Sequence, residues 1–149
     1  KLLLVALVEG ARGLLFTCAD ISFDGKLVIP KEVTQIPNSA YSSCPGLAFL
    51  LFEDGGTSEL TIGNDAFKQT GISAVDIPNR MTIIGNAAFA LVASLKELTF
   101  EGGGTSDLTI GNEAFLGTGI SAVDIPKRVT IIGNSAFYGI ATLKELTFE

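Results

Sequence analysis

The sequence contains no histidine and no tryptophan among its 149 residues, and only two cysteines. Histidine is the usual general base of proteins and the commonest ligand of transition metals, so Ser/His/Asp triads, Cys/His pairs and histidine-containing zinc sites are excluded. Cys18 and Cys44 are too far apart for a Cys-x-x-Cys pair, which leaves one disulfide or two thiols. No Gly-rich phosphate loop with its lysine is present either. We therefore expect no catalytic residue, no metal site and no cofactor.

Charge is scarce as well. Charged residues make up 17% of the chain, against about 25% in an ordinary soluble domain. The 10 basic residues are outnumbered by 16 acidic ones. Basic residues such as Lys31, Arg80, Lys96 and Arg128 are not clustered, which predicts no nucleic-acid partner. With 47% apolar residues and a net charge of only −6, the chain can bury enough surface to fold, so intrinsic disorder is excluded.

Long apolar runs are also missing. The longest uninterrupted run, Leu2 to Val8, has seven residues, whereas a membrane-spanning helix needs roughly 18 or more. The sequence therefore predicts no transmembrane segment. Lys1 followed by this run is either the end of a secretory signal or a degenerate first structural turn, and the sequence leaves both open.

What the sequence does have is an internal repeat. Residues 60–101 and 108–149 align without gaps at an offset of 48 residues, and 32 of the 42 aligned positions are identical. Each unit is itself double, because the triplet Ile-Gly-Asn recurs at spacings of 22, 26 and 22 residues. The longer spacing comes from a Gly-rich insert at 101–107, which is matched by a similar segment at 53–59.

Each repeat has the pattern of a short strand followed by a bend. In Ile72 to Pro78 the last residues alternate apolar and polar, which is typical of a strand, and Pro78 ends it because proline lacks the N–H of a continuing ladder. A second extended piece, a Gly-Asn corner and an Ala-Phe pair follow. Units this small cannot bury their own apolar stripe, so we expect them to stack into a solenoid with a parallel sheet. One aromatic residue per turn would then form a buried ladder of Phe67, Phe89, Phe115 and Phe137, and Tyr41 occupies the equivalent position one turn earlier.

The Gly-Asn corners are predicted to be structural. Gly at this place fits a positive φ or a close approach of two backbones, and the asparagine can bond free backbone groups at the bend. The glycines are Gly63, Gly85, Gly111 and Gly133. Threonine also recurs once per turn, and a row of threonines along a flat face would suit an ice- or surface-binding array, although strand propensity explains it equally well. These residues are Thr34, Thr61, Thr82, Thr109 and Thr130.

The motif LxxLxFE or IxxVDIP, followed by IGNxAF, resembles the leucine-rich repeats of the BspA-like, or Treponema pallidum-type, family over about residues 27–149. The resemblance implies an α/β, β-rich leucine-rich repeat solenoid. Its superhelix would be right-handed, with a parallel sheet on the concave face and turns or short helical segments on the convex side. Cys44 occupies the cysteine position of the family, where the other repeats carry Thr, Val or Ile. We therefore predict a small, buried, reduced thiol there rather than a disulfide.

The repeat boundaries predict one solenoid domain over residues 1–149, cut from a longer array. Residues 1–26 form a degenerate repeat or cap, and residues 27–59, 60–107 and 108–149 form double-repeat units.

In such repeats, the residues between the buried strand positions project from the concave sheet and usually carry partner recognition. This face is mildly acidic here, and no calcium-binding motif accompanies its carboxylates. A solvated face without a specific ligand stays the alternative. The candidate partner-binding residues are Leu51, Asp76, Lys96, Glu97, Thr99, Glu101, Asp124, Lys144, Glu145 and Thr147.

The main functional hypothesis is a non-enzymatic protein–protein interaction module, similar to family members that act as cell-surface or secreted adhesins. An extracellular or cell-surface location is expected from the resemblance, and an intracellular one in a protist or alga stays open. The alternative is a structural or assembly segment that makes end-to-end contacts with further repeats or subunits. The ice- or surface-binding array is a third hypothesis.

Overall fold

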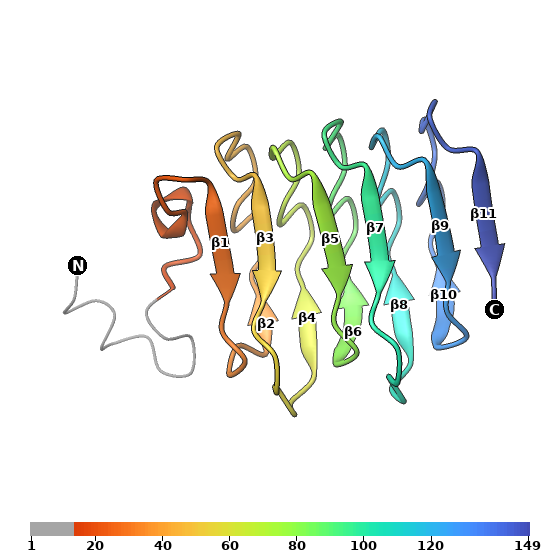
Figure 1. The fold of residues 1–149 in the computed structure, drawn as a ribbon, viewed down its shortest axis with the longest axis horizontal. Helices are drawn as coiled ribbons and strands as arrows, with labels where there is room; N and C mark the ends of the chain where they lie inside the picture. Colours follow the sequence, from red (N-terminus) through yellow and green to blue (C-terminus); the bar gives the residue numbers. More distant parts are fainter. Residues whose placement is uncertain (1–13) are drawn as a thin grey trace.

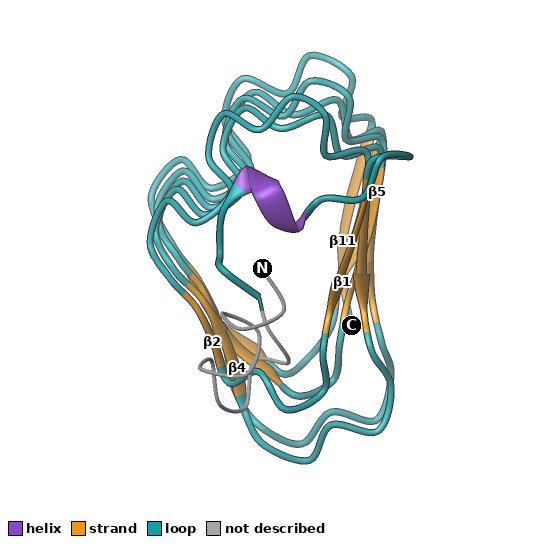
Figure 2. Cartoon of the chain, turned by 90° about the vertical axis from the view of Figure 1, so that its left-hand side faces the viewer, coloured by secondary structure: helices purple, strands orange, loops and turns teal. Residues whose placement is uncertain are grey.

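A computed structural model describes residues 14–149, which coil into a flattened solenoid (Figure 1). Two rows of short strands lie on opposite sides of the coil, and turns and loops connect them (Figure 2). The front sheet, as we call the first row, comprises β1 (Lys26–Ile29), β3 (Phe49–Phe52), β5 (Ala74–Ile77), β7 (Glu97–Phe100), β9 (Ala122–Ile125) and β11 (Glu145–Phe148). The back sheet comprises β2 (Gln35–Ile36), β4 (Leu60–Ile62), β6 (Met81–Ile84), β8 (Leu108–Ile110) and β10 (Val129–Ile132). The predicted solenoid with parallel strands is confirmed, and its right-handed sense stays a prediction.

The two sheets differ in continuity. The back sheet is one hydrogen-bonded ladder in the order β10-β8-β6-β4-β2, whereas the front sheet consists of the separate parallel pairs β1-β3, β5-β7 and β9-β11. Each break in the front sheet follows a strand that leads into one of the two Gly-rich inserts, at 53–59 and 101–107. Because the breaks and the inserts both occur at every second turn, we attribute the breaks to the inserts.

The core lies between the sheets and contains an aromatic stack. Tyr41, Phe67, Phe89 and Phe115 are fully buried, and their rings stack nearly parallel with centroids 5.2–5.5 Å apart. Phe137 continues the stack at 5.3 Å. Such aromatic pairs contribute about 0.5–1.5 kcal/mol beyond their buried area. The predicted aromatic ladder is confirmed as core.

The Gly-Asn corners form a second ladder at the surface. The side-chain Oδ1 of Asn38, Asn64, Asn86 and Asn112 each accepts a hydrogen bond of 2.7–2.9 Å from the backbone N–H of the asparagine one turn further on. In each Gly-Asn corner, a Cβ on the glycine would lie only 2.4–2.7 Å from the backbone of the previous turn. These glycines are Gly63, Gly85, Gly111 and Gly133. Close backbone approach is therefore what these glycines provide. The residues with a left-handed backbone conformation lie two positions after these glycines, at Asp65, Ala87, Glu113 and Ser135.

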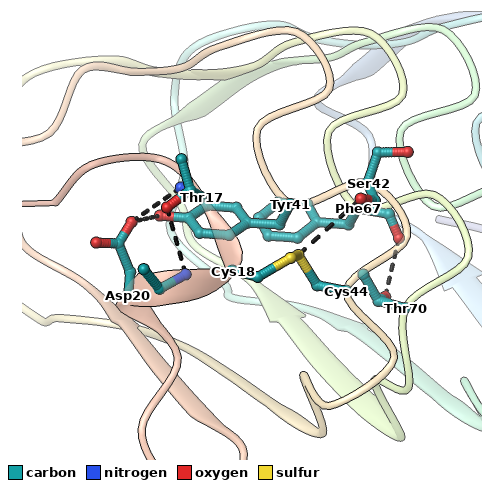
Figure 3. Close-up of a disulfide and its surroundings, with 9 residues drawn as sticks. Thr17, Cys18, Asp20, Tyr41, Ser42, Cys44, Phe67 and Thr70 are labelled. Atoms are coloured by element: carbon teal, nitrogen blue, oxygen red, sulfur yellow. Dashed lines mark hydrogen bonds between the residues drawn. A yellow bond between two sulfur atoms is a disulfide. The ribbon is translucent and has the colours of Figure 1, made fainter.

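The described N-terminal segment caps the coil, and it overturns the prediction for Cys44. A 3₁₀-helix, η1 (Cys18–Asp20), begins with a capping box between Thr17 and Asp20. Cys18 and Cys44 form a disulfide with their Cα atoms 5.6 Å apart (Figure 3). The prediction of a reduced thiol was wrong because the two cysteines are separated by 26 residues, the length of one long repeat, so they occupy adjacent turns of the stack.

Tyr41 reinforces this cap. Its hydroxyl donates a 3.0 Å hydrogen bond to Oδ2 of Asp20, and Figure 3 shows the ring beside the disulfide. Burial, together with the nearby Asp20 carboxylate, strongly raises the pKa of Tyr41. The ring also meets Phe16 at a tilt, with centroids 6.5 Å apart. Three kinds of contact therefore hold the cap on the first complete turn.

The row of threonines considered for a surface-binding array does not form. In the back sheet Thr61 pairs with Ile83, Ile83 with Thr109, and Ile131 with Thr109, so threonine and isoleucine alternate. Thr82 and Thr130 fall where the register shifts. These irregularities follow the three-residue connections that precede β6 and β10. The five threonines thus lack the alignment that a surface-binding array would need.

Between the two sheets, the coil is made of turns and loops. Within residues 14–149, η1 is the only helix, so the short helical segments expected on the convex side are not seen there. No helix in this part of the chain has the length and hydropathy required to cross a membrane. The apolar run Leu2 to Val8, expected to be a signal remnant or a first turn, lies outside the described residues.

Candidate partner-binding face

The outward side chains of the front sheet form two rows across its six strands. Within each strand pair, the register brings equivalent positions side by side. Because side chains alternate between the two faces of a strand, every second residue projects to solvent. One row contains Lys26, Phe49, Ala74, Glu97, Ala122 and Glu145, and the other contains Val28, Leu51, Asp76, Thr99, Asp124 and Thr147.

The chemistry of these rows changes along the molecule. On the first strand pair, Val28 is 44%, Phe49 51% and Leu51 47% exposed. We call these three residues the apolar patch. At the equivalent places on β5 and β7 the chain has Asp76, Glu97 and Thr99, all exposed, and the third pair repeats that chemistry. The backbone is thus repeated while the outward side chains switch from apolar to acidic and polar.

The breaks in the front sheet open two clefts. The one between β3 and β5 has a volume of about 360 Å³ and is lined by four carboxylates, those of Asp54, Asp76, Glu97 and Glu101, and by no basic side chain. We call it the acidic cleft. Leu51 lines it too, so the cleft and the apolar patch share a residue. The second cleft, between β7 and β9, has about 340 Å³ and is lined in part by Asp124 and Glu149.

The structure brings half of the predicted partner-binding residues together. Leu51, Asp76, Glu97, Thr99 and Glu101 all line the acidic cleft. Asp76 is held in place because its Oδ1 accepts a 2.8 Å hydrogen bond from the Thr99 hydroxyl. Asp124 and Thr147 form the same bond in the third strand pair, away from this cleft.

Three other predicted residues, Lys96, Lys144 and Glu145, are exposed and lie outside the acidic cleft. The ammonium group of Lys96 donates to the carbonyl of Ala93, three residues earlier, at 3.1 Å. Lys144 and Glu145 are exposed on the last turn. Glu101, which lines the cleft, also has a structural partner, because its Oε2 accepts a 2.9 Å hydrogen bond from the backbone N–H of Asn79.

Two arginines that sequence reasoning treated only as scattered charges donate hydrogen bonds to backbone carbonyls of earlier turns, and Arg80 holds the first insert through Ser58. The guanidinium of Arg80, which is 8% exposed, donates to the carbonyls of Val33 at 2.8 Å and Ser58 at 3.2 Å. Arg128, one unit later, donates to the carbonyls of Met81 and Pro78. Burial lowers the pKa of both guanidinium groups, and the Glu101 carboxylate opposes that shift. The signal for this role was their recurrence at an offset of 48 residues.

Phe49 is the functional candidate that sequence reasoning missed. It is half exposed and pairs in register with Lys26. Comparing it with its counterpart Glu97 in the next unit would have revealed the change of chemistry. Within residues 14–149, no group of three or more His, Cys, Asp or Glu side chains is placed to hold a metal ion.

Comparison with known proteins agrees with this architecture. A family model described as "BspA type Leucine rich repeat region (6 copies)" matches residues 16–144. The chain belongs to this BspA-type leucine-rich repeat family. None of the curated proteins gives a significant match.

Two solved structures share the BspA-type fold. The pneumococcal vaccine antigen PcpA superimposes with a TM-score of 0.76 at 26% identity, over 84% of this chain and 30% of that one. A leucine-rich cell surface protein from Faecalibacterium prausnitzii superimposes with a TM-score of 0.55 at 24% identity, over 83% of this chain and 38% of its own. The chain thus spans about a third of the length of each relative.

Proposed function

We propose that this chain is a non-enzymatic protein-interaction module that binds its partner through the front sheet. The observation that carries the proposal is the exposed face itself, where outward side chains on six adjacent strands vary without disturbing the core. The outward residues of the first strand pair differ from those of the second pair, which the third pair repeats, while the buried Leu, Ile and Phe positions persist. Sheet faces of solenoids offer extended binding surfaces of this kind.

We further propose an adhesin-like role outside the cell or on its surface. The disulfide between Cys18 and Cys44 supports this location, because such bonds form and persist in oxidising compartments. The name of one relative, a pneumococcal vaccine antigen, is in keeping with it.

Surface plasmon resonance against extracellular matrix and serum proteins tests the module. The oxidised chain would be immobilised and compared with a front-face variant, Asp76→Lys with Asp124→Lys. Its control adds two lysines on the back sheet, at Ile83→Lys and Ile131→Lys, where the parent residues are 46% and 56% exposed. This control changes the net charge by about +2, against about +4 in the front-face variant. We expect the front-face variant to bind about tenfold more weakly or worse, and the back-sheet variant to bind as the parent does. Equal losses in both variants, or no binding by the parent, would contradict the proposal.

A further inference from the structure

We infer that the first half of the front sheet binds an extended polypeptide segment in which a bulky apolar residue adjoins lysine or arginine. The inference rests on the proposed function and specifies its partner. The apolar side chain would lie on the apolar patch, and the basic residues would lie in the acidic cleft.

The apolar patch differs from the rest of the front sheet in being both apolar and exposed. Val28, Phe49 and Leu51 are all 44–51% exposed, on a face where the later units carry Asp, Glu and Thr. The change of chemistry is confined to the outward positions, since the inward residues of the same strands, such as Leu27 and Leu50, are buried as in the later units. Phe23, which is fully exposed, lies in the turn before β1, and the carbonyl of Gly25 in that turn accepts a 3.0 Å bond from the N–H of Phe49. Three exposed apolar side chains therefore lie on this strand pair, and Phe23 precedes it in the chain.

The acidic cleft begins where the patch ends. Leu51 belongs to the patch and also lines the cleft with Asp76 and Glu97. Among residues 14–149, no basic side chain lines the cleft. Glu101 also acts on the guanidinium groups of Arg80 and Arg128. The other three carboxylates therefore supply most of the negative potential, which attracts lysine and arginine and repels acidic segments and phosphates. Charge complementarity of this kind governs the choice of partner and its orientation. The basic part of the segment is therefore expected over β5 and β7, and the apolar part over β1 and β3.

The dimensions suit a short peptide. Hydrogen-bonded strands lie about 4.8 Å apart. The path from β1 to β7 crosses two such pairs and the break between β3 and β5. It is therefore at least about 15 Å long, which about five or more extended residues would span at ~3.3 Å each. The contact of the apolar residue with the patch and that of the basic residue with the cleft would together fix the direction in which the segment crosses the strands.

Selection from a phage-displayed library of random 12-residue peptides tests the inference. Peptides enriched on the oxidised parent chain should share an aromatic or aliphatic residue within about five residues of lysine or arginine. A synthetic peptide with the enriched sequence would then be titrated by fluorescence anisotropy at low and high salt. We expect Phe49→Ser with Leu51→Ser to weaken its binding about tenfold or more. Asp76→Lys with Glu97→Lys should weaken it about tenfold at low salt and less at high salt, because salt screens exposed charges.

The matched control is Asp124→Lys with Glu145→Lys, which makes the same charge reversal and removes the equivalent Asp–Thr bond one unit later. We expect it to bind the peptide within about twofold of the parent. If the enriched peptides lack the apolar and basic residues, or respond to the control but not to the first two variants, this inference is overturned while front-face binding stands. If no peptide is enriched, or none responds to any of these variants, both proposals fail.

Discussion

Residues 14–52 add contacts that occur once to the first members of the recurring ladders, whereas residues 60–149 hold together through contacts that recur. The first region has the Cys18–Cys44 disulfide and the Tyr41–Asp20 hydrogen bond. The second has the asparagine ladder, the stacked phenylalanines and an arginine in each unit. The first region also has the apolar patch in place of the Asp/Thr pairs. We conclude that the departures from the repeat pattern, rather than the pattern itself, carry the specific properties of this molecule.

The largest expected effect comes from removing the contact that occurs once. The double variant Cys18→Ser with Cys44→Ser should destabilise residues 14–52 by about 2–4 kcal/mol, because the disulfide closes a chain segment of 26 residues. Since stacked repeats unfold in sections, the loss should be local. Hydrogen exchange would show faster exchange in β1 and β3 and little change in β7 to β9. As a control, a reductant should affect the parent and leave the variant unchanged. Uniformly faster exchange throughout the chain would contradict the distinction between the regions.

Removing a recurring contact should have a smaller effect that depends on position. Arg80→Met keeps the apolar stem but leaves the carbonyls of Val33 and Ser58 without this donor, which should cost about 1–3 kcal/mol. Arg128→Met, the matched variant one unit later, should cost less because Arg128 is more exposed. Urea unfolding of both variants compares them. Equal losses would show that burial does not set the contribution of these arginines.

Because of the hydrogen bond from Tyr41 to Asp20, the stability of residues 14–52 should fall at alkaline pH. The ordinary pKa of Tyr41 is 10.0 and folding raises it, so the folded chain favours the neutral phenol. Its contribution to stability is complete below pH 10.0 and falls by about 1.4 kcal/mol per pH unit above it. Tyr41→Phe, which restores the residue of the later turns, should cost about 1 kcal/mol at neutral pH through the lost bond and remove this alkaline loss. Urea unfolding monitored between pH 8 and pH 11 measures both effects. Parallel pH profiles for parent and variant would contradict the assignment.

The smallest expected effect is a gain within the recurring part. Leu91 adopts a left-handed conformation with φ 60°, and the equivalent position one unit later is Gly139, with φ 71°. Leu91→Gly should relieve backbone strain and stabilise the chain by about 0.5–1 kcal/mol. The reverse change, Gly139→Leu, should destabilise it by a similar amount. Thermal unfolding measures both, and changes of the same sign in the two variants would rule out this explanation.

Most of the fold could be predicted from the sequence because periodic contacts leave periodic residues. The Phe positions and the Gly-Asn corners revealed the aromatic stack and the asparagine ladder. The disulfide was missed because Cys44 was compared with Thr70 and Thr118 in the other repeats, although its spacing from Cys18 equals one long repeat. The threonine row was wrong because short connections shift the register at Thr82 and Thr130.

The binding face was predicted only in part. Alternation along each strand identified which residues project outward, and five of the ten candidates line one cleft. The cleft itself follows from the break between β3 and β5, which depends on how two turns of unequal length stack. Periodicity in the sequence does not contain that information. Phe49 was overlooked because it stands where the repeat has an acidic residue.

The most direct test of the central claim converts the exposed face of the first region to that of the second. The triple variant Val28→Asp, Phe49→Glu and Leu51→Thr places on β1 and β3 the residues that β5 and β7 carry at the same positions, while the buried residues stay unchanged. Binding of the selected peptide would be measured for this variant and the parent, with urea unfolding as the check of the fold. The account predicts equal stability within about 0.5 kcal/mol and binding at least about tenfold weaker. Unchanged binding by a folded variant would contradict it.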